Sequence, residues 1–156
     1  MPVTQDDIRN HLAANSEVFV QIASPEDGSP EIAWGDTFFY ARNLNGEPPK
    51  MPFATIVTKD YENFDCDSKL NRGGLYRLNV EVGKEKFLEL FGVKPGEFEH
   101  QRGEFDFASV DRIFPHPIYG SHGWLSVINP NHESMGVINS LLDFSLKQAL
   151  RRRATS

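Results

Sequence analysis

The stretch "LYRLNVEVGKEKFLELFG" (residues 75–92) joins a strand directly to a helix, and this pair decides the fold class. Apolar and polar side chains alternate in its first part: Tyr76, Leu78, Val80 and Val82 share one face, and Arg77, Asn79 and Glu81 share the other. That period is typical of a strand with one face on the core and one on water or a partner. Helical spacing then relates the apolar residues Phe87, Leu88, Leu90 and Phe91. We therefore predict a strand over residues 75–82 and a helix over residues 84–92, which Gly92 ends in a left-handed conformation.

Further strands and two more helices are predicted around this pair. Period-two patterns or β-branched residues favour strands over residues 17–23, 36–41, 53–59 and 124–129. Thr4 and Asp7 form the pattern of a capping box for an N-terminal helix, and Ser134 is a candidate N-cap for a long amphipathic helix at the other end of the chain. Residues 93–107 are expected to form an irregular surface excursion, followed by a short helical turn over residues 108–114.

The order of these elements predicts an α+β domain. The connections between the early strands are too short for parallel crossovers, so these strands are expected to pair in antiparallel fashion. The final helix has a wide apolar stripe that only the sheet is large enough to cover. We expect one domain over residues 1–156, a two-layer sandwich with its helices packed on one face of an antiparallel sheet.

Composition and charge exclude several classes of protein. Cys66 is the only cysteine, so the chain cannot form an intramolecular disulfide or a multi-thiolate metal site. Asp6 and Asp7 occupy the region where a secretory signal is positively charged, and no segment approaches the roughly 18 continuous apolar residues of a membrane span. The net charge of −6 is concentrated in residues 1–70, which hold 5 basic and 12 acidic side chains and would repel a phosphate backbone. We predict a cytoplasmic protein with no membrane partner, for which nucleic-acid binding is disfavoured.

Four phrases of the sequence resemble a known family. They are "WGDTFFY", "PFATIVTKDY", "FDCDSKLNRGGLYRLNVEVG" and "FPHPIYGSHGWLSVINP", and with the final helix they span Trp34 to Arg153. They resemble a bacterial family of domains of unknown function, which is similar in outline to the MmcQ/YjbR-like proteins through a histidine-proline loop, a Gly-Trp strand start and a terminal helix. The wider resemblance implies a fold like that of secretion chaperones and a "double wing" mode of DNA contact. It carries no catalytic residue over to this chain.

The histidine-proline loop has two interpretations. In the first, His116 and His122 bind a metal ion with Asp111 and His132, although the two loop histidines are not spaced like ligands on one helix or strand. In the second, the prolines and glycines of the loop shape a rigid strap that seats Trp124 under the final helix, while the His116 imidazole orients the backbone through hydrogen bonds. The second interpretation explains more of the residues, so we predict no metal ligand and no cofactor.

A second polar cluster lies in the loop "TKDYENFDCDSKLNRGG" (residues 58–74). Asp60, Asp65 and Asp67 lack the regular spacing of a calcium loop. Cys66 lies between two of these carboxylates, which disfavour the thiolate that nucleophilic attack requires. No serine occupies a glycine-flanked elbow. We therefore predict no catalytic residue.

Five residues are predicted to form a polar floor for an anionic small molecule or a peptide carboxylate: Lys59, Arg72, Arg77, Asn79 and His116. Arg77 and Asn79 project from the strand face opposite to the core, and basic side chains bind carboxylates through charge-assisted hydrogen bonds. The alternative is that the charges on this face form salt bridges with acids on neighbouring strands.

These observations favour a non-catalytic binding or adaptor domain whose partner is a small molecule or a protein. Two alternatives stay open. One is a DNA-binding double-wing module that uses the basic end "KQALRRR" (residues 147–153). The other is a metal-dependent hydrolase built on Asp111, His116 and His122.

Overall fold

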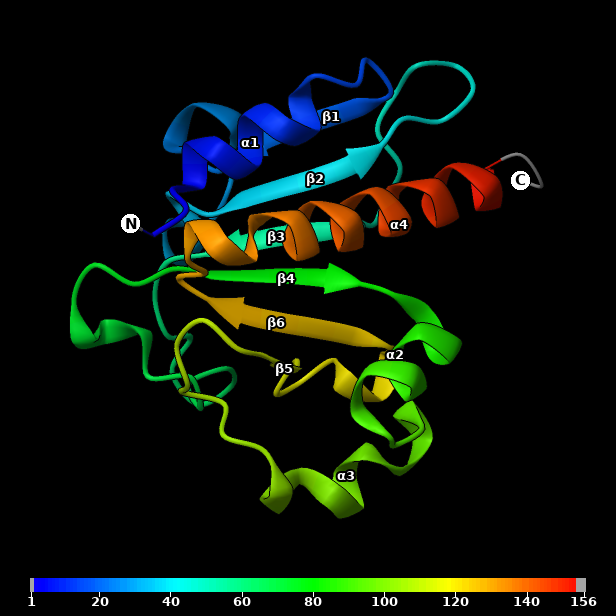
Figure 1. Ribbon diagram of the computed structural model, residues 1–156. Helices are drawn as coiled ribbons and strands as arrows, with labels where there is room; N and C mark the ends of the chain where they lie inside the picture. The colour runs from blue at the N-terminus through cyan, green and yellow to red at the C-terminus, as the bar shows by residue number, and fades with distance from the viewer. Residues whose placement is uncertain (1, 154–156) are drawn as a thin grey trace.

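The computed structural model describes residues 2–153, and within them the strands form one six-stranded antiparallel sheet (Figure 1). The strands are β1 (Val18–Ile22), β2 (Thr37–Ala41), β3 (Ala54–Val57), β4 (Arg77–Glu81), β5 (Ile113–Pro115) and β6 (Trp124–Ile128). The helices are α1 (Gln5–Ala13), α2 (Gly83–Phe91), α3 (Phe98–Gln101) and α4 (Met135–Arg153). The strands lie in the order β1-β2-β3-β4-β6-β5. The predicted α+β class is confirmed.

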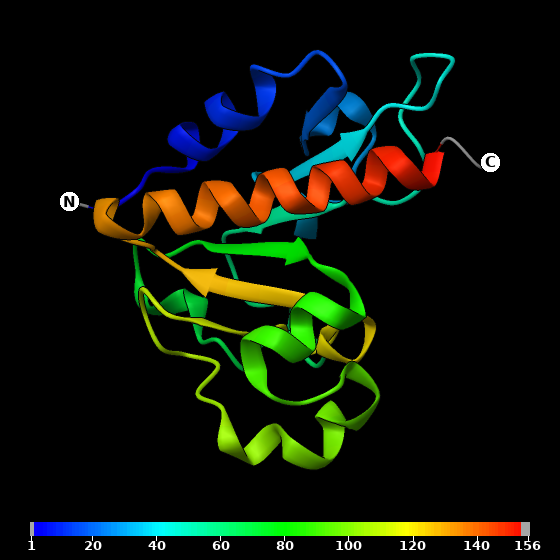
Figure 2. The same ribbon diagram turned by 45° about the vertical axis from the view of Figure 1, so that its right-hand side comes forward.

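The helices α1, α2 and α4 cover one face of the sheet, with α4 crossing its middle (Figure 1, Figure 2). The core between the two layers is apolar and includes Ile8, Leu12, Phe39, Ile56, Leu78, Val80, Phe87, Leu125, Ile138 and Leu142. Burial of these side chains is the main favourable term that holds the layers together. The prediction that the helices pack on one face of the sheet is confirmed for these three helices.

Local sequence signals explain where the helices begin and end. The Thr4 hydroxyl accepts a hydrogen bond from the Asp7 amide, and the Asp7 carboxylate accepts one from the Thr4 amide, which confirms the predicted capping box. Gly92 follows α2 at φ 71°, as predicted. Leu88 is 40% exposed, so the predicted apolar stripe of α2 is wrong at this residue. The Ser134 hydroxyl donates a hydrogen bond to Asp111 just before α4.

The segment before the histidine-proline loop differs from its prediction. The expected helical turn over residues 108–114 is wrong, because Ile113–Pro115 form β5, which pairs with β6. A proline is tolerated there because β5 is an edge strand. Residues 93–107 are not only a surface excursion, because they contain α3 and bury Phe98 completely. The Phe98 ring packs so close to Gly120 that a Cβ atom at Gly120 would lie 2.8 Å from it.

Trp124 lies on the sheet face that the helices do not cover. In the pairing of β4 with β6 it stands opposite Glu81, whereas Leu125 and Val127 point to the helical layer. Side chains alternate along a strand, so the burial of Leu125 under the helices forces Trp124 to the other side. The prediction that the strap seats Trp124 under the final helix is therefore wrong.

Candidate functional site

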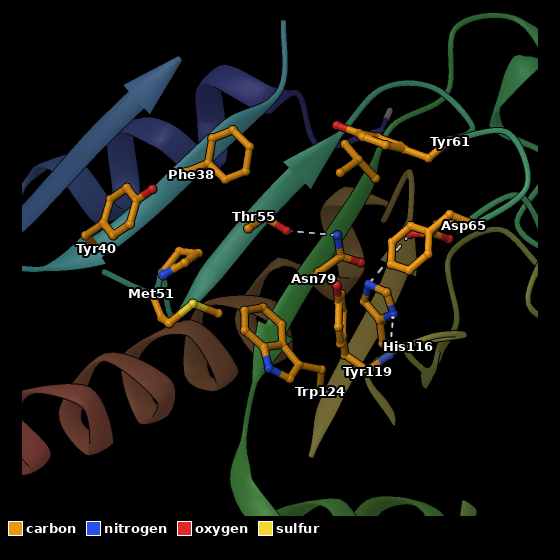
Figure 3. A pocket seen from close by; sticks show the side chains of 13 residues that line it. Phe38, Tyr40, Met51, Thr55, Tyr61, Asp65, Asn79, His116, Tyr119 and Trp124 are labelled. Atoms are coloured by element: carbon orange, nitrogen blue, oxygen red, sulfur yellow. Dashed lines mark hydrogen bonds and ion pairs between the residues drawn. The ribbon is translucent and has the colours of Figure 1, made fainter. Parts of the chain in front are cut away.

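The sheet face opposite to the helices holds a pocket of about 340 Å³, which we call the aromatic pocket (Figure 3). Its walls are mostly apolar and consist of Phe38, Tyr40, Met51, Pro52, Val57, Tyr61, Phe64, Tyr119 and Trp124. Its floor is polar and consists of Thr55, Asp65, Asn79 and His116. A small-molecule site has this volume and this combination of apolar walls with a few fixed polar groups.

Both strands and loops contribute residues to the aromatic pocket. Phe38 and Tyr40 come from β2, where the buried Phe39 between them points to the helical layer. Asn79 lies opposite Thr55 of β3 and Ser126 of β6, so the middle of the floor is rigid sheet. The loop of residues 58–74 supplies Tyr61 and Phe64, and the strap of residues 116–123 supplies Tyr119 (Figure 3). Met51 and Pro52 come from the loop between β2 and β3.

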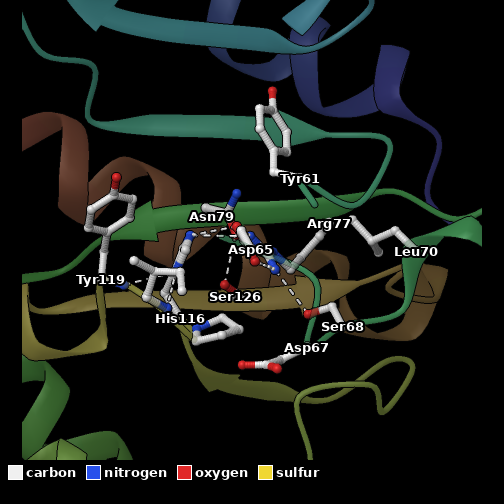
Figure 4. A network of polar contacts seen from close by, with 12 residues as sticks. Tyr61, Asp65, Asp67, Ser68, Leu70, Arg77, Asn79, His116, Tyr119 and Ser126 are labelled. Atoms are coloured by element: carbon white, nitrogen blue, oxygen red, sulfur yellow. Dashed lines mark hydrogen bonds and ion pairs between the residues drawn. The ribbon is translucent and has the colours of Figure 1, made fainter. Parts of the chain in front are cut away.

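Arg77 is the centre of a buried polar network beneath the pocket (Figure 4). Its guanidinium binds both oxygens of Asp65, with Nη1–Oδ1 at 2.9 Å and Nη2–Oδ2 at 2.5 Å. Nη1 also donates to the Ser68 hydroxyl, and Nε donates to Asn79 Oδ1. Arg77 is 1% exposed and Asp65 is 8% exposed, so each charge is desolvated and balanced by the other.

The Asn79 amide links this network to the floor of the pocket. Its Oδ1 accepts a hydrogen bond from the Ser126 hydroxyl at 2.7 Å, in addition to the one from Arg77. Its Nδ2 donates to the Thr55 hydroxyl at 2.9 Å. Because both ends of the amide are held, the orientation of Asn79 is fixed before any ligand binds.

His116 is held in one orientation and one tautomer. Its Nδ1 accepts hydrogen bonds from the backbone amides of Ile118 and Tyr119, each at 3.0 Å. A ring nitrogen that accepts carries no proton, so these partners place the proton of the neutral imidazole on Nε2. Burial, and secondly the charge of Arg77, hold the pKa of His116 well below its usual range. The prediction that His116 orients the strap through backbone hydrogen bonds is confirmed.

Arg102 ties the strap to the loop that covers Arg77. Its guanidinium donates to the carbonyl oxygen of Pro117 and, at 2.8 Å, to the Asp67 carboxylate. The same group lies over the rings of Phe98 and Phe107, at 5.5 and 4.9 Å from their centroids. These cation–π contacts and hydrogen bonds fix the relative position of the loop of residues 58–74 and the strap, which are two of the loops that line the pocket.

Asp36 fixes the wall that carries Tyr61. This carboxylate is fully buried and accepts hydrogen bonds from the Thr58 amide and the Thr58 hydroxyl, both at 3.0 Å. It also accepts one from the Tyr61 hydroxyl. Burial, together with this hydrogen bond, raises the pKa of Tyr61 above its ordinary value, so the phenol loses its proton at a higher pH than an exposed tyrosine does.

Comparison with known protein families gives a match for this chain. Residues 3–156 match the Family of unknown function (DUF6194). The chain belongs to this family. The resemblance to a family of domains of unknown function is thereby confirmed. Neither the curated proteins nor the solved structures gave a match to the chain.

Three of the five predicted site residues of this DUF6194 domain lie together. Asn79 and His116 line the aromatic pocket, and Arg77 lies directly beneath it. The expectation of an open polar face is wrong at Arg77, because the loop of residues 58–74 covers it and supplies its acid, Asp65. The alternative predicted salt bridges with acids on neighbouring strands. Arg77 does form a salt bridge, but its partner Asp65 lies in a loop and not on a strand.

The other two predicted site residues bind protein groups elsewhere. The Lys59 ammonium donates to the Trp34 carbonyl oxygen at 2.8 Å and lies 3.3 Å from Asp36. The Arg72 guanidinium donates to backbone carbonyl oxygens of the loops, namely those of Lys69, Ser68 and Ala108. Within the described chain, neither side chain lines the aromatic pocket.

Sequence reasoning missed most of the aromatic walls. Phe38 and Tyr40 flank a buried residue in a predicted strand, and two aromatic side chains on the outward face of that strand were a usable signal. Phe64 and Tyr119 come from loops, where no periodicity marks a residue as part of a site. Only the tertiary structure brings them beside the strands.

The residues proposed for a metal site do not converge. The Asp111 carboxylate accepts hydrogen bonds from Asn131 and Ser134, just before α4, while His116 belongs to the network around Arg77. Over residues 2–153, no three His, Cys, Asp or Glu side chains are grouped so that they could hold a metal ion.

The basic end of α4 lies against acidic side chains of the same chain. Arg152 pairs with Glu81 at 2.7 Å, and Arg153 pairs with Glu17. No helix in the described part of the chain combines the length and apolarity needed to cross a membrane.

Proposed function

We propose that this DUF6194 domain binds a small molecule with a flat, mostly apolar body in the aromatic pocket. The observation that carries the proposal is the combination of aromatic walls with a buried, hydrogen-bonded floor in one cavity of about 340 Å³. Aromatic side chains contribute large contact areas at low conformational cost, and they favour stacked or edge-on contact with another ring. A flat ligand uses both properties.

Exposed apolar side chains at the mouth of the pocket support the same proposal. Phe64 is 53% exposed and Tyr119 is 41% exposed, and their rings meet edge to face with centroids 6.2 Å apart. Met51 is 69% exposed and contributes to the same pocket. Large apolar side chains gathered at one exposed place are typical of binding sites. A ligand that enters here would cover all three.

The charge distribution favours a neutral ligand over an anionic one. Arg77 is the only cation next to the floor among the described residues, and Asp65 neutralises it through two hydrogen bonds. Lys59 and Arg72 bind protein groups outside the pocket. The floor therefore offers fixed dipoles and no net charge.

The floor also favours binding over catalysis. A general base needs an unprotonated atom that faces the substrate. The unprotonated nitrogen of His116 is Nδ1, which already accepts two backbone hydrogen bonds. The Asp65 carboxylate is engaged by Arg77 on both oxygens. Neither group is set up to remove a proton from a ligand.

Binding of a fragment panel, followed by ¹H–¹⁵N NMR, tests the proposal. The panel holds neutral bicyclic aromatics such as indole and quinoline with their acidic and basic analogues, indole-3-acetate and tryptamine. Neutral members are expected to shift the indole signal of Trp124, the side-chain amide of Asn79 and the backbone amide of Tyr119. The proposal would be contradicted if none of the three signals changed its chemical shift at millimolar concentrations of any member.

Paired variants show whether the shifts report the pocket. Phe64→Ala removes an exposed wall of the pocket and is expected to weaken binding. Leu88→Ala removes an exposed apolar side chain from α2, in the layer that covers the other face of the sheet, and is expected to leave binding unchanged. Equal affinity of the two variants would place the binding site elsewhere.

The DNA-binding alternative and the resemblance to MmcQ/YjbR-like proteins stay predictions. Fluorescence anisotropy with a labelled DNA duplex tests the DNA-binding alternative directly, because phosphate contacts give an affinity that falls steeply as salt is added. Salt-sensitive binding of the duplex would favour this alternative over the small-molecule proposal.

A further inference from the structure

The chemistry of the floor identifies the class of ligand, an inference that rests on the proposed function. We propose that the ligand carries an uncharged oxygen acceptor, such as the carbonyl of an aromatic ketone, amide or lactam, which accepts a hydrogen bond from Nε2–H of His116. The flat body of such a ligand lies between the aromatic walls, and its oxygen is the innermost atom. His116 is then the residue that selects the ligand.

The first step of the argument is that Nε2 of His116 is a donor. The other ring nitrogen, Nδ1, already accepts hydrogen bonds from the backbone amides of Ile118 and Tyr119, at 3.0 Å each. Both amides belong to the strap that Gly120 turns and Arg102 ties down, so the ring cannot flip without breaking two backbone hydrogen bonds. A neutral imidazole with an accepting Nδ1 donates from Nε2.

The second step is that this donor lacks an acceptor in the protein. The nearest polar atom is Nη2 of Arg77 at 3.2 Å, which is itself a donor. The nearest carboxylate oxygen, Oδ2 of Asp65, lies 3.9 Å away, beyond hydrogen-bond range, and already accepts from Arg77 at 2.5 Å. Across the described residues, Nε2–H of His116 therefore meets no acceptor.

The third step is that the unpaired donor belongs to the pocket. His116 is 4% exposed, and its side chain lines the aromatic pocket (Figure 3). A buried N–H without an acceptor costs free energy, so an oxygen atom supplied by a ligand gains the bond that the protein leaves unmade.

The fourth step concerns the charge of the acceptor. A carboxylate on His116 would lie close to the Asp65 carboxylate, whose Oδ2 is only 3.9 Å from Nε2, and like charges at such a separation repel strongly when buried. A cationic group would lie near Arg77 and would offer no acceptor. A neutral carbonyl oxygen avoids both conflicts.

The tautomer of His116 can be measured without a ligand. Long-range ¹H–¹⁵N correlations of the imidazoles distinguish Nε2–H from Nδ1–H. The expected result is a neutral His116 ring protonated on Nε2 between pH 6 and 8. A ring protonated on Nδ1, or one that carries both protons at pH 7, would overturn the inference.

A matched pair of probes tests the acceptor. Indane and 1-indanone share a flat bicyclic body and differ in one carbonyl oxygen. We expect 1-indanone to bind roughly tenfold more tightly, the factor that one hydrogen bond of ordinary strength supplies. Indane-1-carboxylate is expected to bind more weakly than 1-indanone.

Variants assign the difference to His116. His116→Phe is expected to remove the difference in affinity between 1-indanone and indane. His100→Phe replaces an exposed histidine on α3 and is expected to keep the preference. If His116→Phe does not fold, the inference is tested on the unmodified protein by the tautomer of His116 and by the relative affinities of indane and 1-indanone.

The outcomes separate this inference from the proposed function. If indane and 1-indanone bind the unmodified protein equally well, the acceptor is wrong while the aromatic pocket stands. If no probe of either panel binds, the proposed function fails, and the inference falls with it.

Discussion

Replacement of Arg77 by methionine is predicted to be among the most damaging single substitutions in this domain. Methionine keeps an unbranched apolar stem but is shorter than arginine and lacks the guanidinium, which donates to Asp65, Ser68 and Asn79. The Asp65 carboxylate, which is 8% exposed, would then have no counter-ion. Arg77→Met thus tests whether the buried network holds the loop of residues 58–74 on the sheet.

The magnitude follows from the burial of the pair. Removal of one partner from a buried ion pair costs about 3–5 kcal/mol, because the other charge stays buried and unpaired. A domain of this size has a free energy of unfolding of about 5–15 kcal/mol, so the loss is a large fraction of the total. The double variant with Arg77→Met and Asp65→Leu removes both charges, and we expect it to cost several kcal/mol less than the sum of the two single substitutions.

Urea unfolding followed by far-ultraviolet circular dichroism measures these differences. The midpoints are compared at equal slope, since a change of slope would mean that the compactness of the unfolded or the folded state had changed. Arg112→Met, at an exposed arginine, is the matched control and is expected to stay within about 0.5 kcal/mol of the unmodified protein. The reasoning is refuted if Arg77→Met costs less than about 1 kcal/mol, or if the two single substitutions are additive.

Three further substitutions or conditions give independent checks. Gly120→Ala should destabilise the fold by about 1–3 kcal/mol in thermal or urea unfolding, because the new Cβ would lie 2.8 Å from the Phe98 ring, whereas Gly96→Ala meets no atom within 4 Å and should be nearly neutral. The pKa of His116 is lower in the folded state than in the unfolded state, so the folded state binds fewer protons at low pH. The contribution of His116 to the free energy of unfolding is therefore complete above a pH of about 6.5 and is lost as the pH falls below that value, by at most about 1.4 kcal/mol per pH unit. His116→Phe should flatten this part of the urea stability profile between pH 7.5 and 4.5. Tyr61→Phe should cost about 2 kcal/mol, since its phenol donates to a fully buried carboxylate, and it should also remove one late transition from an alkaline absorbance titration at 295 nm. A titration with an unchanged number of late tyrosines would contradict the assigned hydrogen bond.

The sequence alone determined the elements whose signals are local. The alternation of residues 75–82 predicted β4, and the capping box of Thr4 and Asp7 predicted the start of α1, because a strand and a helix each repeat over a few residues. Antiparallel pairing followed from connections too short for crossovers, and the helical layer followed from the wide apolar stripe of α4. Each of these conclusions needs only the chain within one element or between two neighbouring elements.

The tertiary structure decided everything that depends on which distant segments meet. Arg77 carries the same polar pattern whether its face is open or covered, and only the folded loop that brings Asp65 over it makes it a buried ion pair. Trp124 was assigned to the wrong face, because the period of a strand gives two faces without saying which one the helices cover. The aromatic pocket joins β2, β3, β4 and β6 to three loops, and its formation depends on packing between residues up to 86 positions apart, from Phe38 to Trp124. The juxtaposition of His116 and Asn79 with these aromatic walls is a consequence of that packing.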